Sequence, residues 1–285
     1  VTINSTLNIT DEMILTNSGS STTIKRNVTT ASFNMFNIAA GATLTLNGSS
    51  SKYITLDGQG GAGKYSLIAN NGKLEVSYVN FINNNAIDTS DIAKPNVRGG
   101  AIHGLDGSTT IIYNCTFTNN KANYGGALLF DGNAKSPTIS SSTFTNNTAY
   151  KYGGAVYLNN GESATFEYCT FTSNTLGGAN GQLGDAFYIQ LKNVTFNGCT
   201  FTSNTNKSHT IHIESSGQTS NNQFEVFFNE SNVLENQAVY VANELDYTLD
   251  NVLHILGGKI SNIEVATTAK TYTPVSISTG HNLED

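Results

Sequence analysis

The side chains that could carry acid–base chemistry are few and scattered along the 285 residues. The pair His103-Gly104 has Asp106 close behind it and Arg98 shortly before it, which is the nearest approach to a polysaccharide-cleaving site. Cleavage of a glycosidic bond by the usual route needs two carboxylates that flank the same bond. No aspartate pair accompanies His103, and Arg98 stands alone. We therefore expect no catalytic residues and interpret the chain as a non-enzyme.

Metal ligation finds equally little support. His209 and His212 are three residues apart, a spacing that sends the two side chains to opposite faces of an extended segment. Cys115, Cys169 and Cys199 are separated by 54 and 30 residues, unlike the short cysteine pairs of zinc sites. We expect neither a metal nor a cofactor. Cys169 and Cys199 form either a disulfide or two free buried thiols.

Composition excludes further classes of protein. The chain has 14 basic and 21 acidic side chains, a net charge of −7, and only two arginines, which disfavours a surface that follows nucleic-acid phosphates. No apolar stretch reaches the 18 or so residues of a membrane span. The sequence starts with valine, so we expect targeting and anchoring segments to lie outside it, with the fragment itself outside the cell and not inserted in a membrane.

A tetrapeptide repeat, F-x-x-N, supplies the elements that must position any site. Its five intact copies begin at Phe81, Phe117, Phe144, Phe171 and Phe201. A sixth, degenerate copy at 233–236 begins with Val233 and ends with Asn236. A unit of about 27 residues cannot bury an apolar face alone and must stack on its neighbours.

A second motif, G-G-A or its variant G-D-A, alternates with the first. Apolar residues recur at every second position around both motifs, which is the period of a β-strand. The residues that follow the glycine motif in register are Ile102, Leu128, Val156, Phe187, Ile211 and Val239. We predict one all-β domain, a single-stranded parallel β-helix of about ten coils, with first coils or a cap at 1–74, the repeat core at 75–241 and closing coils at 242–285.

Stacked coils place equivalent residues in columns about 4.8 Å apart. The phenylalanines are therefore predicted to stack inside the coil. The motif asparagines, Asn84, Asn120, Asn147, Asn174, Asn204 and Asn236, are predicted to form a ladder that bonds to itself and to the turning backbone.

The same register predicts an outward row of side chains, one per coil. This aromatic row consists of His103, Leu129, Tyr157, Tyr188, His212 and Tyr240. Amides and carboxylates lie two positions further along each strand, so the row has the ring faces and polar tips that a flat glycan or peptide site needs. We expect His103, Tyr157, Tyr188, His212 and Tyr240 to contact a ligand. The alternatives are that β-propensity favours tyrosine here or that a loop covers the row.

Insertions between the motifs are further candidates for recognition, because rigid scaffolds often carry their contacts on loops. They lie at 86–98, 176–183 and 217–223.

The alternation of F-x-x-N with G-G-A and an aliphatic residue resembles the repeats of the chlamydial polymorphic membrane proteins, and is similar to adhesin-like surface proteins of some methanogenic archaea. The likeness covers about residues 81–241. It implies a right-handed β-helix displayed on a cell surface or secreted, acting in adhesion to a host or neighbouring-cell protein or carbohydrate, as a monomer or an end-to-end assembly. A polysaccharide-active enzyme of the same fold and a structural spacer are the alternatives.

Overall fold

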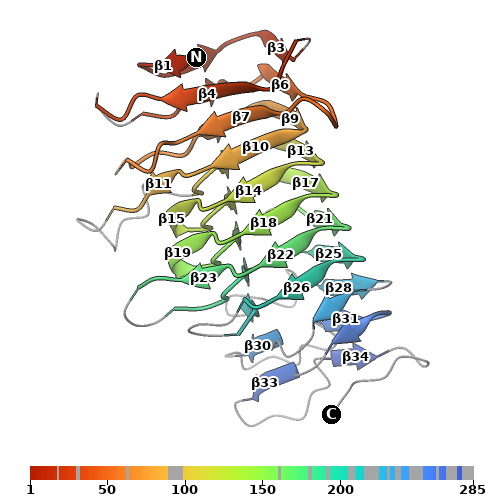
Figure 1. Ribbon diagram of the computed structural model, residues 1–285. Helices are drawn as coiled ribbons and strands as arrows, with labels where there is room; N and C mark the ends of the chain where they lie inside the picture. Colours follow the sequence, from red (N-terminus) through yellow and green to blue (C-terminus); the bar gives the residue numbers. More distant parts are fainter. Residues whose placement is uncertain are drawn as a thin grey trace.

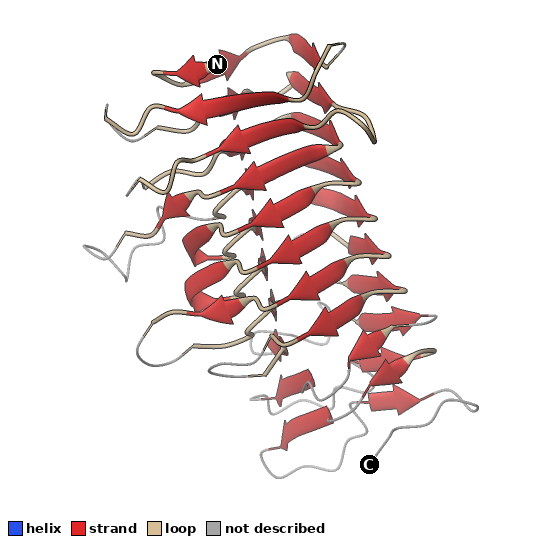
Figure 2. Cartoon of the chain, in the orientation of Figure 1, coloured by secondary structure: helices blue, strands red, loops and turns tan. Residues whose placement is uncertain are grey.

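The computed structural model describes residues 1–17, 19–29, 33–61, 64–88, 99–159, 162–178, 182–190, 193–204, 209–214, 225–229, 232–234, 239–243, 253–260, 263–267 and 275–277. All the regular secondary structure in these segments is β-strand, and Figure 2 shows it as one stack of coils. Over the same segments, no helix of membrane-spanning length and hydropathy is found. The predicted fold, a right-handed parallel β-helix, is confirmed.

Three long parallel sheets form the sides of the rod, and each coil contributes one strand to each sheet (Figure 1). Sheet A contains β1 (Thr2–Ile3), β4 (Thr22–Arg26), β7 (Ile54–Asp57), β10 (Val79–Ile82), β14 (Thr116–Thr118), β18 (Thr143–Thr145), β22 (Thr170–Thr172), β26 (Thr200–Thr202), β29 (Val233–Leu234) and β32 (Lys259–Ile260). Sheet B contains β2 (Leu7–Ile9), β5 (Phe36–Ile38), β8 (Ile68–Asn70), β12 (Ile102–Gly104), β16 (Leu128–Phe130), β20 (Val156–Asn159), β24 (Phe187–Gln190), β27 (Ile211–Glu214), β30 (Val239–Asn243) and β33 (Ile263–Thr267). Sheet C contains β3 (Glu12–Thr16), β6 (Thr43–Asn47), β9 (Lys73–Ser77), β13 (Thr109–Tyr113), β17 (Lys135–Ser140), β21 (Ala164–Glu167), β25 (Val194–Asn197), β28 (Val226–Asn229), β31 (Leu253–Ile255) and β34 (Val275–Ile277).

A fourth, shorter sheet lies between sheets A and B in the middle coils; we call it the side sheet. It contains β11 (Asn85–Ala86), β15 (Lys121–Tyr124), β19 (Thr148–Tyr152) and β23 (Thr175–Leu176). The sequence pattern did not predict these strands. They follow directly on the F-x-x-N motif and lead into the glycines that precede sheet B.

The core is built from columns of identical or similar side chains, as the repeat predicts. The five motif phenylalanines are buried and stacked, with ring centroids of successive coils 4.6 to 4.9 Å apart. Nearly parallel rings at this distance add to the free energy gained from burying their area. The predicted register of the apolar columns in sheets B and C is also confirmed, for example Phe166 opposite Phe196 and Val156 opposite Phe187.

The predicted sixth copy of the motif is wrong by one residue. Phe201 pairs with Leu234, and Thr200 pairs with Val233. Leu234 therefore occupies the phenylalanine column, and Asn236 lies outside the described residues. Val233 and Leu234 are both apolar, so the sequence pattern alone allowed either of them to occupy the phenylalanine column.

Each coil in the middle of the rod turns its corners at residues in the left-handed region. One such coil has Tyr168 at φ 52°, Ser173 at φ 55° and Gly184 at φ 75°. Non-glycine residues occupy this region at a cost of about 1 kcal/mol or more. Glycine is required only at the third corner, because a Cβ on Gly184 would lie 1.9 Å from the carbonyl oxygen of Phe187.

The predicted asparagine ladder is present for Asn84, Asn120, Asn147, Asn174 and Asn204, all fully buried. At Asn147, Oδ1 accepts from the backbone N–H and from Nδ2 of Asn120, both at 3.1 Å. Its Nδ2 donates to the carbonyl oxygen of Phe117 and to Asn174 Oδ1, both at 2.9 Å. Every polar group of the amide is thus satisfied, which removes the penalty for burying it.

Arg26 closes the first end of the ladder. Its guanidinium is buried and donates to Asn84 Oδ1 and to the carbonyl oxygens of Phe33 and Tyr65, the latter two at 3.2 Å. The guanidinium reaches Asn84 next to Gly58. A glycine is needed there, because a Cβ on residue 58 would collide with Asn84. Burial lowers the pKa of Arg26, and the neutral oxygens around it solvate the charge.

The ladder makes a stability prediction. Asn147→Ala removes four hydrogen bonds and leaves buried donors and an acceptor unpaired, so we expect the free energy of unfolding to fall by at least about 3 kcal/mol. Asn146→Ser is the matched control, because serine occupies the same left-handed corner at Ser173 and Ser203. Urea denaturation followed by circular dichroism measures both, and equal stability of the two variants would contradict a stabilising role for the ladder.

Candidate functional site

The aromatic row lies on the outer face of sheet B, in the predicted register. His103 pairs with Leu129, which pairs with Tyr157 and so on down to Tyr240. The rings stack along the rod. For example, the ring centroids of Tyr188 and His212 are 5.1 Å apart, and the angle between the ring planes is 2°. The structure therefore brings together the residues singled out as a ligand site.

The prediction that this row is open to a ligand is wrong for its middle. Tyr157 is 9% exposed, Tyr188 4% and His212 2%. Tyr152 of the side sheet stacks on Tyr188 at 4.6 Å, and Tyr124 lies 5.6 Å from Tyr157. The side sheet thus covers Tyr157 and Tyr188, because the tyrosine just before each glycine pair packs on the ring of the aromatic row one coil further on.

Beneath this cover, Tyr188 of one coil and His212 and Glu214 of the next make polar contacts. Tyr188 donates its hydroxyl to Glu214 at 3.4 Å, and His212 Nε2 lies 3.6 Å from the same carboxylate. Burial and the Glu214 charge raise the pKa of Tyr188, so the phenol remains protonated and a donor. The group packs like a second small core and offers no open face to a ligand.

The prediction that His209 and His212 face opposite sides is wrong. His209 lies just before β27, outside the strand, so strand alternation does not apply to it. Both rings stack on Tyr240, at 4.5 and 5.1 Å. His209 Nε2 lies 2.9 Å from Glu264 Oε2. Among the described residues no group of three metal-ligating side chains occurs.

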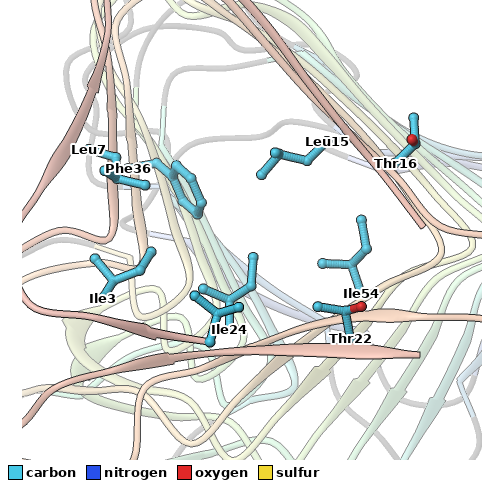
Figure 3. A pocket seen from close by; sticks show the side chains of 9 residues that line it. Ile3, Leu7, Leu15, Thr16, Thr22, Ile24, Phe36 and Ile54 are labelled. Carbon is cyan, nitrogen blue, oxygen red and sulfur yellow. The ribbon is translucent and has the colours of Figure 1, made fainter. Parts of the chain in front are cut away.

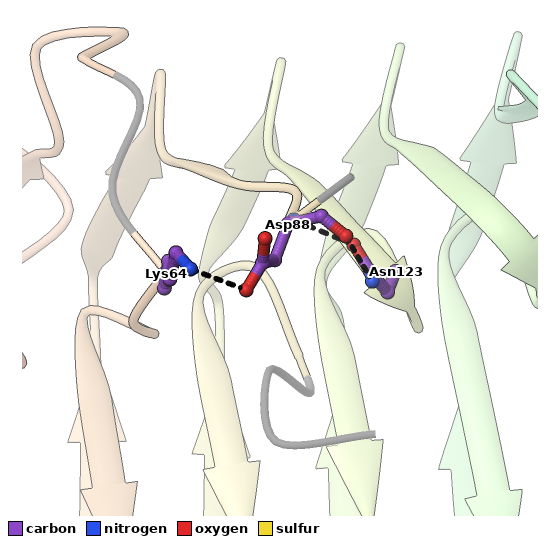
Figure 4. A network of polar contacts seen from close by, with 3 residues as sticks. All are labelled: Lys64, Asp88 and Asn123. Atoms are coloured by element: carbon purple, nitrogen blue, oxygen red, sulfur yellow. Dashed lines mark hydrogen bonds and ion pairs between the residues drawn. The ribbon is translucent and has the colours of Figure 1, made fainter. Parts of the chain in front are cut away.

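Side-chain contacts hold the start of the insertion at 86–98, which the structure describes as far as Asp88. Asp88 forms an ion pair with Lys64 at 2.8 Å and exchanges two backbone–amide hydrogen bonds with Asn123, both at 2.9 Å (Figure 4). These contacts fix the start of the insertion against the side sheet. Residues 89–98, including Arg98, the centre of the second insertion at 179–181 and all of 217–223 lie outside the described residues.

A polar pocket of about 210 Å³ lies where the side sheet begins; we call it the corner pocket. Its lining is Gly60, Asn83, Asn84, Asn85, Asn119 and Lys121. The sequence pattern did not single out this site. The available signal was Lys121, which stands where the next two coils have Thr148 and Thr175.

The outer face of sheet A carries a regular array of threonines, which we call the threonine face. Its columns are in strict register, with Thr143 opposite Thr170 and Thr145 opposite Thr172. All of these threonines are exposed or half-buried. The members are Thr116, Thr118, Thr143, Thr145, Thr170, Thr172, Thr200 and Thr202.

The first coil leaves an apolar cavity of about 310 Å³ at its end of the rod. Ile3, Ile24, Phe36 and Ile54 are among the side chains that point into it (Figure 3). The lining contains no acidic, basic or histidine side chain, so none of its side chains can carry acid–base chemistry.

All three cysteines are free and buried, which settles the alternative left open for Cys169 and Cys199. They share one column, and the next residue in it is Asn232, whose Oδ1 accepts from the Cys199 N–H at 2.8 Å. Burial raises the pKa of the Cys115 thiol to about 12, and raises that of Cys169 as well.

Comparison with known proteins identifies the architecture only. A family model described as right handed beta helix region matches residues 12–183 and 67–253. No curated protein and no solved structure shows significant similarity.

The covered aromatic row predicts a stability effect. Tyr188→Ala removes a buried ring, so we expect the free energy of unfolding to fall by roughly 3 kcal/mol. Tyr168→Ala removes a ring that is 61% exposed and serves as the control. Denaturant titration distinguishes them; a Tyr188 variant as stable as the wild type would show that the row is open.

The thiols give a second prediction. Because all three thiols are buried and out of reach of a reagent, the cysteines should resist a thiol-reactive dye at pH 8 in the native protein. All three should react after denaturation without reductant. Mass spectrometry counts the labels, and one label in place of three after denaturation would contradict free Cys169 and Cys199.

Proposed function

Because the chain belongs to the family of right-handed β-helix regions, we propose that it is an adhesin-like domain, surface-displayed or secreted, that binds a protein or glycan on another cell through its lateral face. The interior is filled by the phenylalanine and aliphatic columns, so a large partner must bind outside. The sides of a parallel β-helix are long, stiff and nearly flat, which suits contact with an extended surface.

The threonine face is the observation that carries this proposal. It presents hydroxyl and methyl groups at the strand spacing of roughly 4.8 Å along the rod. Threonine has a stiff χ1, so little side-chain entropy is lost when such a surface binds. The face is also uncharged, and its desolvation therefore costs little compared with that of a charged surface.

The motif repeats support a location outside the cell. They resemble those of surface adhesins, and stacked amides and rings hold the fold. The domain would reach its surface through segments outside these 285 residues, and we place its partner on a host or neighbouring cell.

Catalysis is less well supported. The buried carboxylate of Glu214 contacts Tyr188 and His212, and Asp57 accepts hydrogen bonds from Gln59. Neither contact is the pair of facing carboxylates that glycoside hydrolysis uses. We therefore propose a binding protein and not an enzyme.

The proposal is tested on an array of immobilised glycans and extracellular-matrix proteins. Thr143→Arg with Thr172→Arg places two bulky charges on the threonine face, and we expect binding to fall by roughly tenfold or more. Stability should change by less than about 0.5 kcal/mol, as is usual for surface substitutions.

Thr165→Arg with Thr195→Arg, which pair on the outer face of sheet C, is the matched control. It should bind as the wild type does. An absence of binding anywhere on the array, or equal loss in both double variants, would overturn the proposal.

A further inference from the structure

We infer that the corner pocket is a binding site for one carboxylated sugar unit, such as a uronate residue of an acidic glycan. This inference rests on the proposed adhesive function, of which the pocket would be the saccharide-specific part. It is carried by the size, the lining chemistry and the position of the pocket in the repeat.

The size suits a single sugar ring. A cavity of about 210 Å³ is smaller than the roughly 300–1,000 Å³ of pockets that hold drug-sized ligands. Its walls come from three successive coils: Gly60 from the first, Asn83 and Asn85 from the second, and Asn119 and Lys121 from the third. A ligand there would contact groups held rigidly by different strands.

The lining is almost entirely amide. An amide carries donors and an acceptor, as a sugar hydroxyl does, so the two kinds of group are complementary. Asn83 Nδ2 already donates to Asp57 at 3.5 Å and Asn85 Oδ1 accepts from the Ile87 N–H at 3.3 Å, which leaves Asn83 Oδ1, Asn85 Nδ2 and the Asn119 amide as the groups for a ligand. Asn84 forms part of the lining, but its own amide is bonded to the protein: Nδ2 donates to the Tyr65 carbonyl oxygen at 3.0 Å and Oδ1 accepts from Arg26. The outer amides of Asn119 and Asn83 lie at left-handed corners, at φ 57° and 55°.

The charge favours an anionic sugar. Lys121 is the only ionisable residue of the lining, which therefore carries a net charge of +1 in a chain of net charge −7. Beside the lining, the buried Arg26 guanidinium bonds to Asn84 and the Asp57 carboxylate accepts from Asn83 Nδ2 at 3.5 Å, so these two opposite charges offset each other and Lys121 determines the net charge of +1. A carboxylate on the sugar would complete a charge-assisted contact with Lys121.

The pocket is formed where the chain departs from the repeat in two ways. The side sheet starts at β11, and the preceding coil turns at Gly60 without adding a strand to that sheet, which leaves a step. Lys121 then replaces the threonine of the coils that follow. Lys121 can be exchanged for the threonine that the repeat itself places at the equivalent position.

The experiment measures the binding of sodium glucuronate and of glucose to the full chain by ligand-observed NMR titration. We expect the wild type to bind glucuronate several-fold more tightly than glucose. Lys121→Thr introduces the residue that the next coil has at Thr148, and it should weaken glucuronate binding roughly tenfold and abolish the preference. Asn119→Ser introduces the residue found at the equivalent corner, Ser173, and should weaken both sugars.

Asn146→Ser makes the same change one coil further on, outside the pocket, and should leave both affinities unchanged. Thermal melts confirm that each variant is folded. Failure of glucuronate to bind at millimolar concentrations, or equal binding by the wild type and the Lys121→Thr variant, overturns the inference. Displacement of glucuronate by inorganic phosphate with no binding of glucose also overturns it, because it indicates a simple anion site.

The array measurement separates this inference from the adhesive function. Binding to proteins on the array without any glucuronate binding overturns the saccharide site and leaves adhesion supported. Glucuronate binding without any binding on the array supports the site and contradicts adhesion through the threonine face.

Discussion

Parallel stacking at one strand spacing is the constraint on which this molecule depends, because every side chain lies directly above and below its equivalents. A column is stable only if its residues can contact copies of themselves. Phenylalanine achieves this by ring stacking at 4.6 to 4.9 Å. Asparagine achieves it because one amide holds two donors and an acceptor, so each rung bonds to the rungs on both sides. A column of like charges would repel itself, which accounts for the scarcity of charged residues, 12% of the chain.

The same constraint explains why the middle of the aromatic row is closed. Tyrosines that stack along the outer face of sheet B expose large apolar surfaces, and covering them is favourable by roughly 25 cal/mol per Å². Tyr124 and Tyr152 belong to the same repeat, so once one folds back over the row its neighbour does so too. The row whose composition best suited a ligand is instead a second core, and accessible chemistry lies on the threonine face and at the corner pocket.

The columns of equivalent side chains could be predicted from the sequence, whereas the side sheet that covers one of them could not. The alignment of Phe117 with Phe144, or of Tyr157 with Tyr188, follows from motif spacing alone. The side sheet could not be predicted, because residues 121–124 and 148–152 are too short for periodicity to distinguish strand from turn. At the sixth copy, Val233 and Leu234 fitted the pattern equally well, and only the pairing with Phe201 separates them. The corner pocket depends on how three coils are placed in space. Lys121 in a column of threonines does not by itself indicate that placement.

The ends of a ladder pose a problem that the repeat itself cannot solve. Every Oδ1 accepts from the coil before it, so the first asparagine, Asn84, has no preceding amide to bond with. Arg26 supplies that donor from a distant strand, beside a glycine that leaves it room. A guanidinium is suited to this task because its several donors satisfy the ladder and nearby carbonyl oxygens at once. The charge terminates a neutral ladder, and it lies next to the corner pocket, whose lining is cationic. The end of the ladder and the beginning of a binding site therefore arise from the same departure from repetition.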